Sequence, residues 1–416
     1  MHYLKNYNKK IIFLLGFFSA LPFFFIPYKP FIYINKYYND GVWDGILTLY
    51  PGYTASLGLA SPFLLVFLAT FFFFRIFFFK NIIENLKLKI LSGLLVILNI
   101  LILFFLSSSL KSLGASASLL GLFMILILMN NFNFKIFCIG FLISLFFFIN
   151  LHALSIVVNG IKFSYSIHGT SIFGIEIYQS LVSYINVVSF FAGTLILKKK
   201  FFSDFLNFKN KKIYSILYYI TLISCFIIII IAARRLAFIL FLISILVLFF
   251  KYLKEKKTYS LMVILTLTTL STIIFFINKF FFQAKRAINY DEMVRPRLDV
   301  LVDSITGILS STRNDILFGK LSGWGNVESS IINLFLYTGI IGLLIYLFTF
   351  IFLVYLIYRN IDNLVIKNNI LYIFFAFIFL LITNIVINPI STPYFFISFF
   401  IIFINSLIVK KNSTSL

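Results

Sequence analysis

Charged side chains gather in one stretch of this chain, residues 278–330, and are sparse in the apolar sequence around it. Six of the 13 acidic residues lie there, and several cations lie among them. The set is Asp291, Glu292, Asp299, Asp303, Asp315, Glu328, Lys279, Lys285, Arg286, Arg295, Arg297, Arg313 and Lys320. Carboxylates can take up a proton, and guanidinium groups bind phosphate oxygens in a bidentate fork. We therefore take this stretch as the candidate site.

Glu328 lies where this stretch meets the next apolar run. A carboxylate at such a junction is partly desolvated and faces an aqueous cavity, which suits a general base for an attacking hydroxyl group. The alternative is an acid at a helix N-terminus, where the macrodipole favours negative charge. The sequence leaves both interpretations open.

The arginines are candidates for binding a phosphate-bearing substrate. Arg295 and Arg297 flank Pro296 at the start of a predicted helix, where anions are attracted. Arg286 and Arg313 lie in the same stretch and could add to the positive field. The alternative for each is a solvated surface charge.

A second pair, Arg234 and Arg235, separates two apolar runs earlier in the chain. It is a candidate clamp for a lipid phosphate at the outer leaflet. The alternative is two arginines that reach from a helix end to lipid headgroups.

The amino-acid composition indicates whether the chain that positions these groups is surrounded by water or by lipid. Of 416 residues, 61% are hydrophobic and only 12% are charged, whereas soluble domains have ~25% charged residues. The net charge of +22 comes largely from lysines in short segments between apolar runs, as in membrane proteins with cytoplasmic basic loops. Membrane lipids, and not a nucleic acid, are therefore the expected surroundings.

Spanning helices need ~20 mainly apolar residues. This length predicts about twelve of them, in an all-α polytopic membrane protein. The predicted spans are 11–28, 57–79, 90–107, 113–129, 135–157, 176–197, 213–232, 236–250, 259–277, 331–357, 370–388 and 394–409.

Alternate connections between these spans carry most of the lysines, and the same side receives both termini. Because basic loops are cytoplasmic, both ends are predicted in the cytoplasm, and the chain is predicted to lie in the inner (plasma) membrane. Arg234, Arg235 and residues 278–330 then lie on the outer side. The whole chain, 1–416, is one membrane domain with 278–330 as its large extracytoplasmic loop.

Within that loop, apolar residues recur at helical spacing from Leu298 to Leu309. They predict an amphipathic helix across the outer mouth of the bundle. Cys138 and Cys225 lie inside apolar spans, and the three histidines are scattered without metal-ligand spacing. No disulfide framework, metal site or other cofactor is predicted.

Three short motifs resemble one superfamily. Glu328-Ser329, nine residues and Gly339-Ile340-Ile341-Gly342 resemble the His-Asn/Ser/Gln, nine residues, Gly-x-x-Gly signature of O-antigen ligases, with glutamate at the histidine position. Asp315–Gly319 through Gly323-Trp324-Gly325 is similar to the approach to that signature in the ligases and in Wzy-type repeat-unit polymerases. Arg235-Leu236-Ala237 is similar to a helix start in the same superfamily. The absent histidine favours the polymerase branch.

The resemblance implies a GT-C-like, all-helical glycosyltransferase. A Wzy-type polymerase transfers a growing glycan from undecaprenyl diphosphate to the non-reducing end of an incoming lipid-linked repeat unit, on the outer face of the membrane. Glu328 would then take the acceptor proton, and Arg235, with Arg234, Arg295 and Arg313, would stabilise the departing diphosphate. A chain-length regulator is a possible further partner.

Two other functions remain open at this point. A ligase would move the finished glycan to a lipid A core. A flippase or exporter would move lipid-linked sugars without lengthening them, and transporters commonly show paired broken helices and charges at mid-membrane. Here the charge is concentrated in one outer loop instead.

Overall fold

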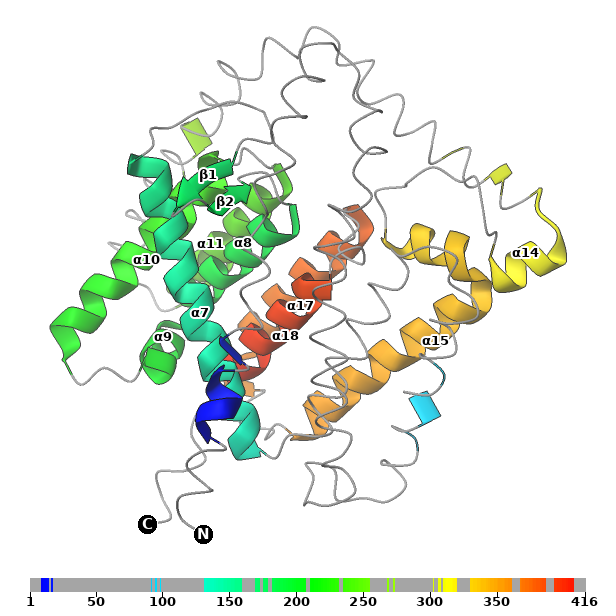
Figure 1. The fold of residues 1–416 in the computed structure, drawn as a ribbon, viewed down its shortest axis with the longest axis horizontal. Helices are drawn as coiled ribbons and strands as arrows, with labels where there is room; N and C mark the ends of the chain where they lie inside the picture. Colours follow the sequence, from blue (N-terminus) through cyan, green and yellow to red (C-terminus); the bar gives the residue numbers. More distant parts are fainter. Residues whose placement is uncertain are drawn as a thin grey trace, which may run out of the picture.

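The computed structural model describes a bundle of long helices with one short hairpin (Figure 1). The residues it describes are 9–14, 16–17, 91, 94–95, 98, 131–158, 169–172, 175–178, 182–206, 210–231, 235–254, 268, 272–273, 302, 306–307, 310–319, 330–360, 367–386 and 393–407. Within them the elements are α7 (Asn131–Val158), β1 (Gly169–Ile172), β2 (Ile175–Tyr178), α8 (Val182–Leu197), α9 (Lys199–Leu206), α10 (Lys211–Ile231), α11 (Arg235–Lys254), α14 (Arg313–Phe318), α15 (Ser330–Asn360), α17 (Ile370–Val386) and α18 (Pro393–Leu407).

Six predicted spans match observed helices to within a few residues. These are α7, α10, α11, α15, α17 and α18, and the short span predicted at 236–250 is a helix of 20 residues. Long apolar runs form helices because a helix satisfies its backbone hydrogen bonds within one segment. The predicted spans at 57–79 and 113–129 lie outside the described residues, as do most of 11–28, 90–107 and 259–277.

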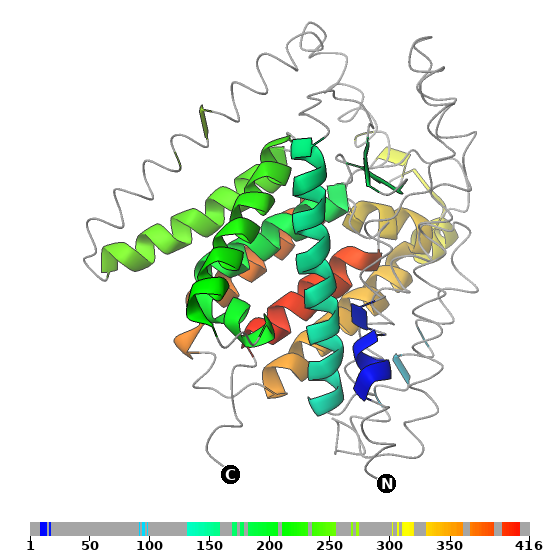
Figure 2. The same ribbon diagram turned by 60° about the vertical axis from the view of Figure 1, so that its left-hand side comes forward.

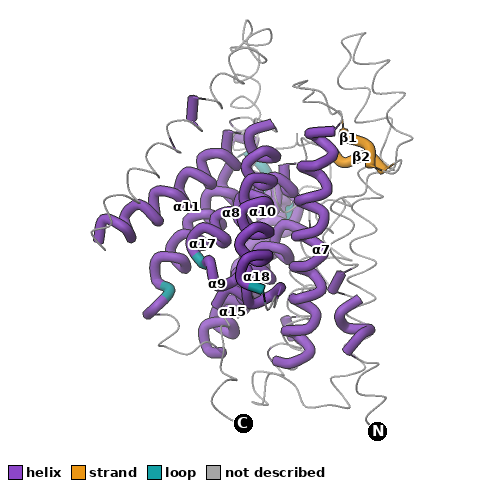
Figure 3. The backbone as a smooth tube through the Cα atoms, turned by 90° about the vertical axis from the view of Figure 1, so that its left-hand side faces the viewer, coloured by secondary structure: helices purple, strands orange, loops and turns teal. Residues whose placement is uncertain are grey.

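The prediction of a helix over 176–197 is wrong at its beginning. Residues 175–178 form β2, which pairs antiparallel with β1 so that Ile172 faces Ile175 and Ser171 faces Glu176. Helix α8 begins only at Val182. Alternating β-branched residues on both sides of Phe173-Gly174 favour a hairpin over a helix. Figure 3 shows the hairpin beside one end of α7, which β1 contacts.

The sequence analysis also missed α9, a short helix in a predicted cytoplasmic connection. Its Phe201, Phe202 and Phe205 are buried, and Lys200 is exposed. The ring of Phe202 contacts Phe146 of α7, with the two centroids 5.8 Å apart. This i, i+1, i+4 spacing of phenylalanines is the signal of an amphipathic helix that lies on the bundle.

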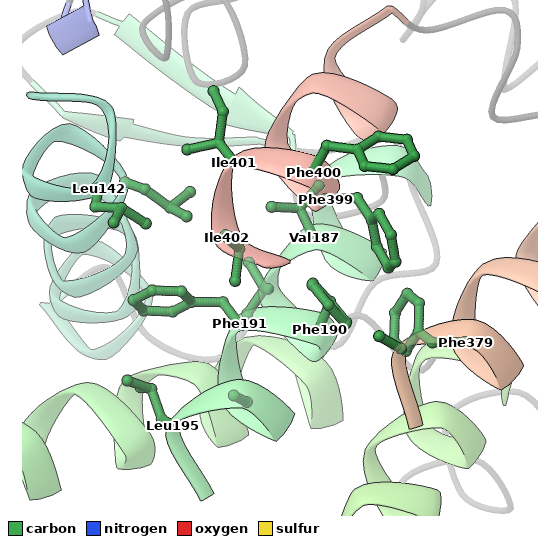
Figure 4. Close-up of a cluster of buried hydrophobic side chains, with 14 of the residues drawn as sticks. Leu142, Val187, Phe190, Phe191, Leu195, Phe379, Phe399, Phe400, Ile401 and Ile402 are labelled. Atoms are coloured by element: carbon green, nitrogen blue, oxygen red, sulfur yellow. The ribbon is translucent and has the colours of Figure 1, made fainter. Parts of the chain in front are cut away.

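The centre of the bundle is an aromatic cluster around Phe190 of α8 (Figure 4). The Phe190 ring lies 4.3 Å from Phe399 of α18, 4.9 Å from Phe379 and 5.7 Å from Phe375, both of α17, measured between centroids. Such separations give offset or tilted ring contacts, which add to the free energy of packing. In Figure 2, α18 (red) slants across the nearly upright α7 (teal), which it contacts.

Hydrogen bonds between helices accompany the aromatic contacts. Asn150 of α7 donates to Thr221 of α10 at 3.2 Å and accepts from Ser224 at 2.9 Å. Tyr218 of α10 donates to the Leu195 carbonyl of α8 at 3.0 Å. Polar side chains of this kind hold helices together in lipid, where apolar burial alone gives little preference for the partner helix.

Contacts also give the relative directions of three helices. Thr194 of α8 contacts Tyr372 of α17, while Phe190 contacts Phe379, so these two helices are antiparallel. Helices α17 and α18 are antiparallel by the same reasoning, because Tyr372 contacts Phe403 and Phe379 contacts Phe399. Thus α8 and α18 run parallel. This agrees with the alternation predicted for successive spans.

Apolar side chains are exposed in stripes on the outside of the bundle. One stripe on α17 consists of Leu371, Phe374, Phe377 and Leu381, and another on α10 consists of Ile213, Ile216, Ile220 and Ile223. Two helical stretches in the described part, Lys135–Val158 and Lys212–Ile230, are long and apolar enough to cross a membrane. The structure is therefore compatible with a helical membrane protein.

The aromatic cluster predicts a large effect of one truncation. Replacing Phe190, which has no exposed surface, by Ala should lower the free energy of unfolding by about 3–5 kcal/mol, because it removes the ring and leaves a cavity. Phe377→Ala is the matched control, since that ring is 63% exposed. Unfolding of the purified variants in detergent, followed by tryptophan fluorescence, measures both effects. Equal losses for the two variants would contradict the central role of Phe190.

Candidate active site

The longest described segment of the candidate loop, residues 310–319, contains α14, a helix of one and a half turns with a defined beginning. The Thr312 hydroxyl accepts a hydrogen bond from the Asp315 amide at 3.3 Å, and the Asp315 carboxylate accepts one from the Thr312 amide at 3.4 Å. This capping box satisfies two N–H groups that have no helical partner. At the other end, Gly319 donates to the Asp315 carbonyl at 2.8 Å and has φ 82°. Asp315 therefore has a structural role in α14.

Arg313 is the first residue of α14, and its side chain is exposed. None of the described α14 residues is buried, and Leu317 and Phe318 are 40% and 47% exposed. The helix therefore presents a cation and two apolar side chains at its surface. A guanidinium group in this position can reach a phosphate oxygen without first leaving a buried ion pair.

Helix α15 is broken at Gly339, the first glycine of the Gly-x-x-Gly motif. Gly339 has φ 65° and ψ −170°, a backbone conformation that is essentially restricted to glycine. A Cβ atom at this position would overlap the Leu317 carbonyl and lie 2.5 Å from the Phe318 amide nitrogen, both in α14. Figure 1 shows α14 against α15 at the place where α15 changes direction. The absence of a side chain at Gly339 therefore permits this close approach of α14 to α15.

Helix lengths suggest what the break separates. All 31 residues of α15 would extend ~46 Å as a straight helix, well beyond the ~30 Å of a hydrocarbon core. Residues 340–360 alone extend ~31 Å, so the part after Gly339 has the length of one membrane crossing. The break therefore divides α15 into residues 330–338 and a longer helical segment, residues 340–360.

Helix α11 begins at Arg235, as the motif Arg235-Leu236-Ala237 predicts. Ser189 of α8 donates a hydrogen bond to the Ala237 carbonyl at 2.7 Å, and Ala237 is completely buried. This bond fixes the first turn of α11 against α8, and the small side chain of Ala237 permits the close approach. Ser189 therefore helps to position the helix that begins at Arg235. The sequence analysis did not identify this role, because a lone serine in an apolar span gives no signal of its hydrogen-bond partner.

The other predicted site residues lie outside the part that the structure describes. These are Glu328, Arg234, Arg286, Arg295 and Arg297, and for Arg235 only the backbone is described. Of the amphipathic helix predicted between Leu298 and Leu309, only Val302, Thr306 and Gly307 are described, each in helical conformation. Helices α11 and α15 both pack against α17. Helix α11 begins at Arg235, and α15 begins shortly after Glu328 in the sequence. The two helices that adjoin these predicted site residues therefore contact one common helix.

Comparison of the chain with protein-family models, with curated proteins and with solved structures finds no match.

Two exposed residues that are predicted to lie on opposite sides of the membrane allow a test of the predicted orientation. Asn314 in α14 belongs to the predicted outer loop, whereas Lys212, in the first turn of α10, lies on the predicted cytoplasmic side, and both side chains are exposed. In spheroplasts, a membrane-impermeant maleimide should label Asn314→Cys, and should label Lys212→Cys only after lysis. The native Cys138 and Cys225 are buried and give little background. The opposite labelling pattern would contradict the orientation.

Proposed function

We propose that this chain is a membrane glycosyltransferase that polymerises polysaccharide repeat units. It would transfer the growing glycan from undecaprenyl diphosphate to the non-reducing end of an incoming lipid-linked repeat unit. The reaction would take place at the outer face of the inner membrane. The proposal includes about twelve spans in a GT-C-like arrangement, with both termini in the cytoplasm.

The observation that carries this proposal is the junction of α14 with α15. The Gly-x-x-Gly motif, which resembles the superfamily signature, coincides with a break in α15 at Gly339 and with the docking of the arginine-bearing α14. A loop element is thus held against a membrane-length helix next to the segment that Glu328 precedes. Such an arrangement suits a site at a membrane surface, where a lipid-linked substrate presents its headgroup.

The proposed reaction is a displacement at the anomeric carbon. The acceptor hydroxyl oxygen forms the new glycosidic bond, the bond from the anomeric carbon to the diphosphate breaks, and Glu328 takes the hydroxyl proton. Negative charge develops on the departing undecaprenyl diphosphate. Arg235 and Arg313, with Arg234 and Arg295, would stabilise that charge. Arg286 and Arg297 would add to binding of the diphosphate and glycan.

One observation favours a different function, the transport of lipid-linked oligosaccharide. Transporters use broken helices, and α15 is broken at Gly339. In transporters, however, the freed backbone groups at a break bind substrate near mid-membrane. Here the Leu317 carbonyl of α14 occupies the space beside Gly339, and the break lies at one end of the membrane-length segment. Polymerisation is therefore the better-supported proposal.

Replacement of the proposed base should abolish polymerisation in cells. Glu328→Gln removes the proton acceptor, and loss of a general base lowers a rate by about 100-fold or more. Glu292→Gln makes the same change elsewhere in the loop and should leave the product unchanged. Separation of the surface polysaccharide by chain length gives the result. A polymerase defect leaves single repeats attached to their acceptor, whereas accumulation of long lipid-linked chains would indicate a ligase.

Purified protein distinguishes an enzyme from a transporter. In detergent micelles there are no two compartments, so a flippase has nothing to transport. Incubation with undecaprenyl-diphosphate-linked repeat units should yield products that contain two or more repeats, resolved by gel electrophoresis. Unchanged substrate with folded wild-type protein would contradict the proposed function.

A further inference from the structure

The break at Gly339 joins a membrane-length helix to an element of the outer loop, and nothing in the Gly-x-x-Gly motif itself explains why the break is there. In the described part of the chain, two glycines have positive φ, and both belong to this junction. Gly319 follows the last residue of α14, and Gly339 is the residue of α15 against which the α14 backbone packs. Gly342, three residues later, shows how different the first glycine is. At Gly342 the three atoms nearest to an added Cβ atom belong to the Thr338 side chain, whereas at Gly339 they are backbone atoms of α14.

We infer that Gly339 is a positioning residue, which seats α14 on α15 and thereby holds Arg313 beside the proposed diphosphate site. This inference rests on the proposed function for its catalytic consequence, but the seat itself can be tested separately.

The contact is made by backbone atoms, which explains why it requires glycine. The Leu317 carbonyl and the Phe318 amide of α14 occupy the space where any side chain at position 339 would begin. Alanine would therefore push α14 away, and in addition it would strain φ 65°, ψ −170°. Because α14 has no buried side chains, little else among its described residues opposes that displacement.

Arg313 must follow α14, because α14 is a rigid turn. The capping box of Thr312 and Asp315 closes its beginning, and the Gly319 amide bond to the Asp315 carbonyl closes its end. Arg313 and Leu317 are one helical turn apart. A displacement at Leu317 therefore reaches the guanidinium group of Arg313, whose side chain is exposed.

The first experiment measures the packing of α14 against Gly339 of α15 without any substrate. Spin labels on Asn314→Cys and Ile351→Cys, both exposed positions, report the distance between α14 and α15 by pulsed electron resonance in nanodiscs. The parent protein should give one narrow distance distribution, and Gly339→Ala should shift or broaden it. Ile340→Ala, a neighbouring position that is 39% exposed, is the control and should leave it unchanged. An unchanged distribution in Gly339→Ala would overturn the inference.

The second experiment asks whether Gly339 affects substrate binding through the position of Arg313. With undecaprenyl-diphosphate-linked repeat unit as the probe, Arg313→Ala and Gly339→Ala should each raise the KM about tenfold, because each removes one charge-assisted contact to the diphosphate. The double variant should be no worse than either single variant, since both remove the same interaction. Additive losses would show that Gly339 does not act through Arg313 and would overturn the positioning role.

A variant on the other side of the junction covers the case in which Gly339→Ala does not fold. Thr312→Ala with Asp315→Ala removes the capping box and leaves α15 intact, so it should broaden the same distance distribution and raise the KM non-additively with Arg313→Ala. An unchanged KM would overturn the inference. If the wild-type protein elongates nothing while the distance results hold, the seat stands and the proposed function fails.

Discussion

Every backbone N–H and C=O group in the hydrocarbon of a membrane needs a partner within the protein, and this constraint governs the structure. In the described part of the chain, six long helices satisfy it along their length: α7, α8, α10, α11, α17 and α18. The break at Gly339 departs from it, because a helix that turns there leaves some of its groups without helical partners. The departure is tolerable for two reasons. The backbone of α14 lies directly against Gly339, and residues 340–360 are by themselves long enough to span the hydrocarbon. A loop helix thereby becomes a fixed part of the bundle.

The same constraint explains which parts of the fold were predictable. Long apolar runs admit only helices in lipid, so the bounds of α7, α10, α11, α15, α17 and α18 follow closely from length and composition. The connections do not obey that rule, and there the prediction was wrong or incomplete. Residues 175–178 pair with β1 although they adjoin an apolar run, and α9 buries three phenylalanines beside the bundle. In both cases a periodicity was present, but a window of twenty residues averages it away.

The candidate site was predictable in outline only. The spacing Thr312-x-x-Asp315 is a readable capping box, and the Arg235 motif correctly marks the start of α11. The direction of the backbone at Gly339 was not readable. Gly339 and Gly342 have the same residue type in the same motif, yet only Gly339 has positive φ. What distinguishes them is the approach of α14, a contact between segments some twenty residues apart, and no local pattern encodes it. Ser189 escaped for the same reason, because its partner carbonyl belongs to another helix.

The packing of α17 against both α11 and α15 bears on how the proposed charges would work together. Packed helices lie ~8–10 Å apart, so two helices that flank a third can be separated by up to ~20 Å. Arginines at the start of α11 and a carboxylate before α15 would then act on different parts of a large substrate. This separation suits the proposed chemistry better than a direct ion pair. An adjacent guanidinium would stabilise the ionised carboxylate and make it a weaker base, whereas the diphosphate needs the cation for itself.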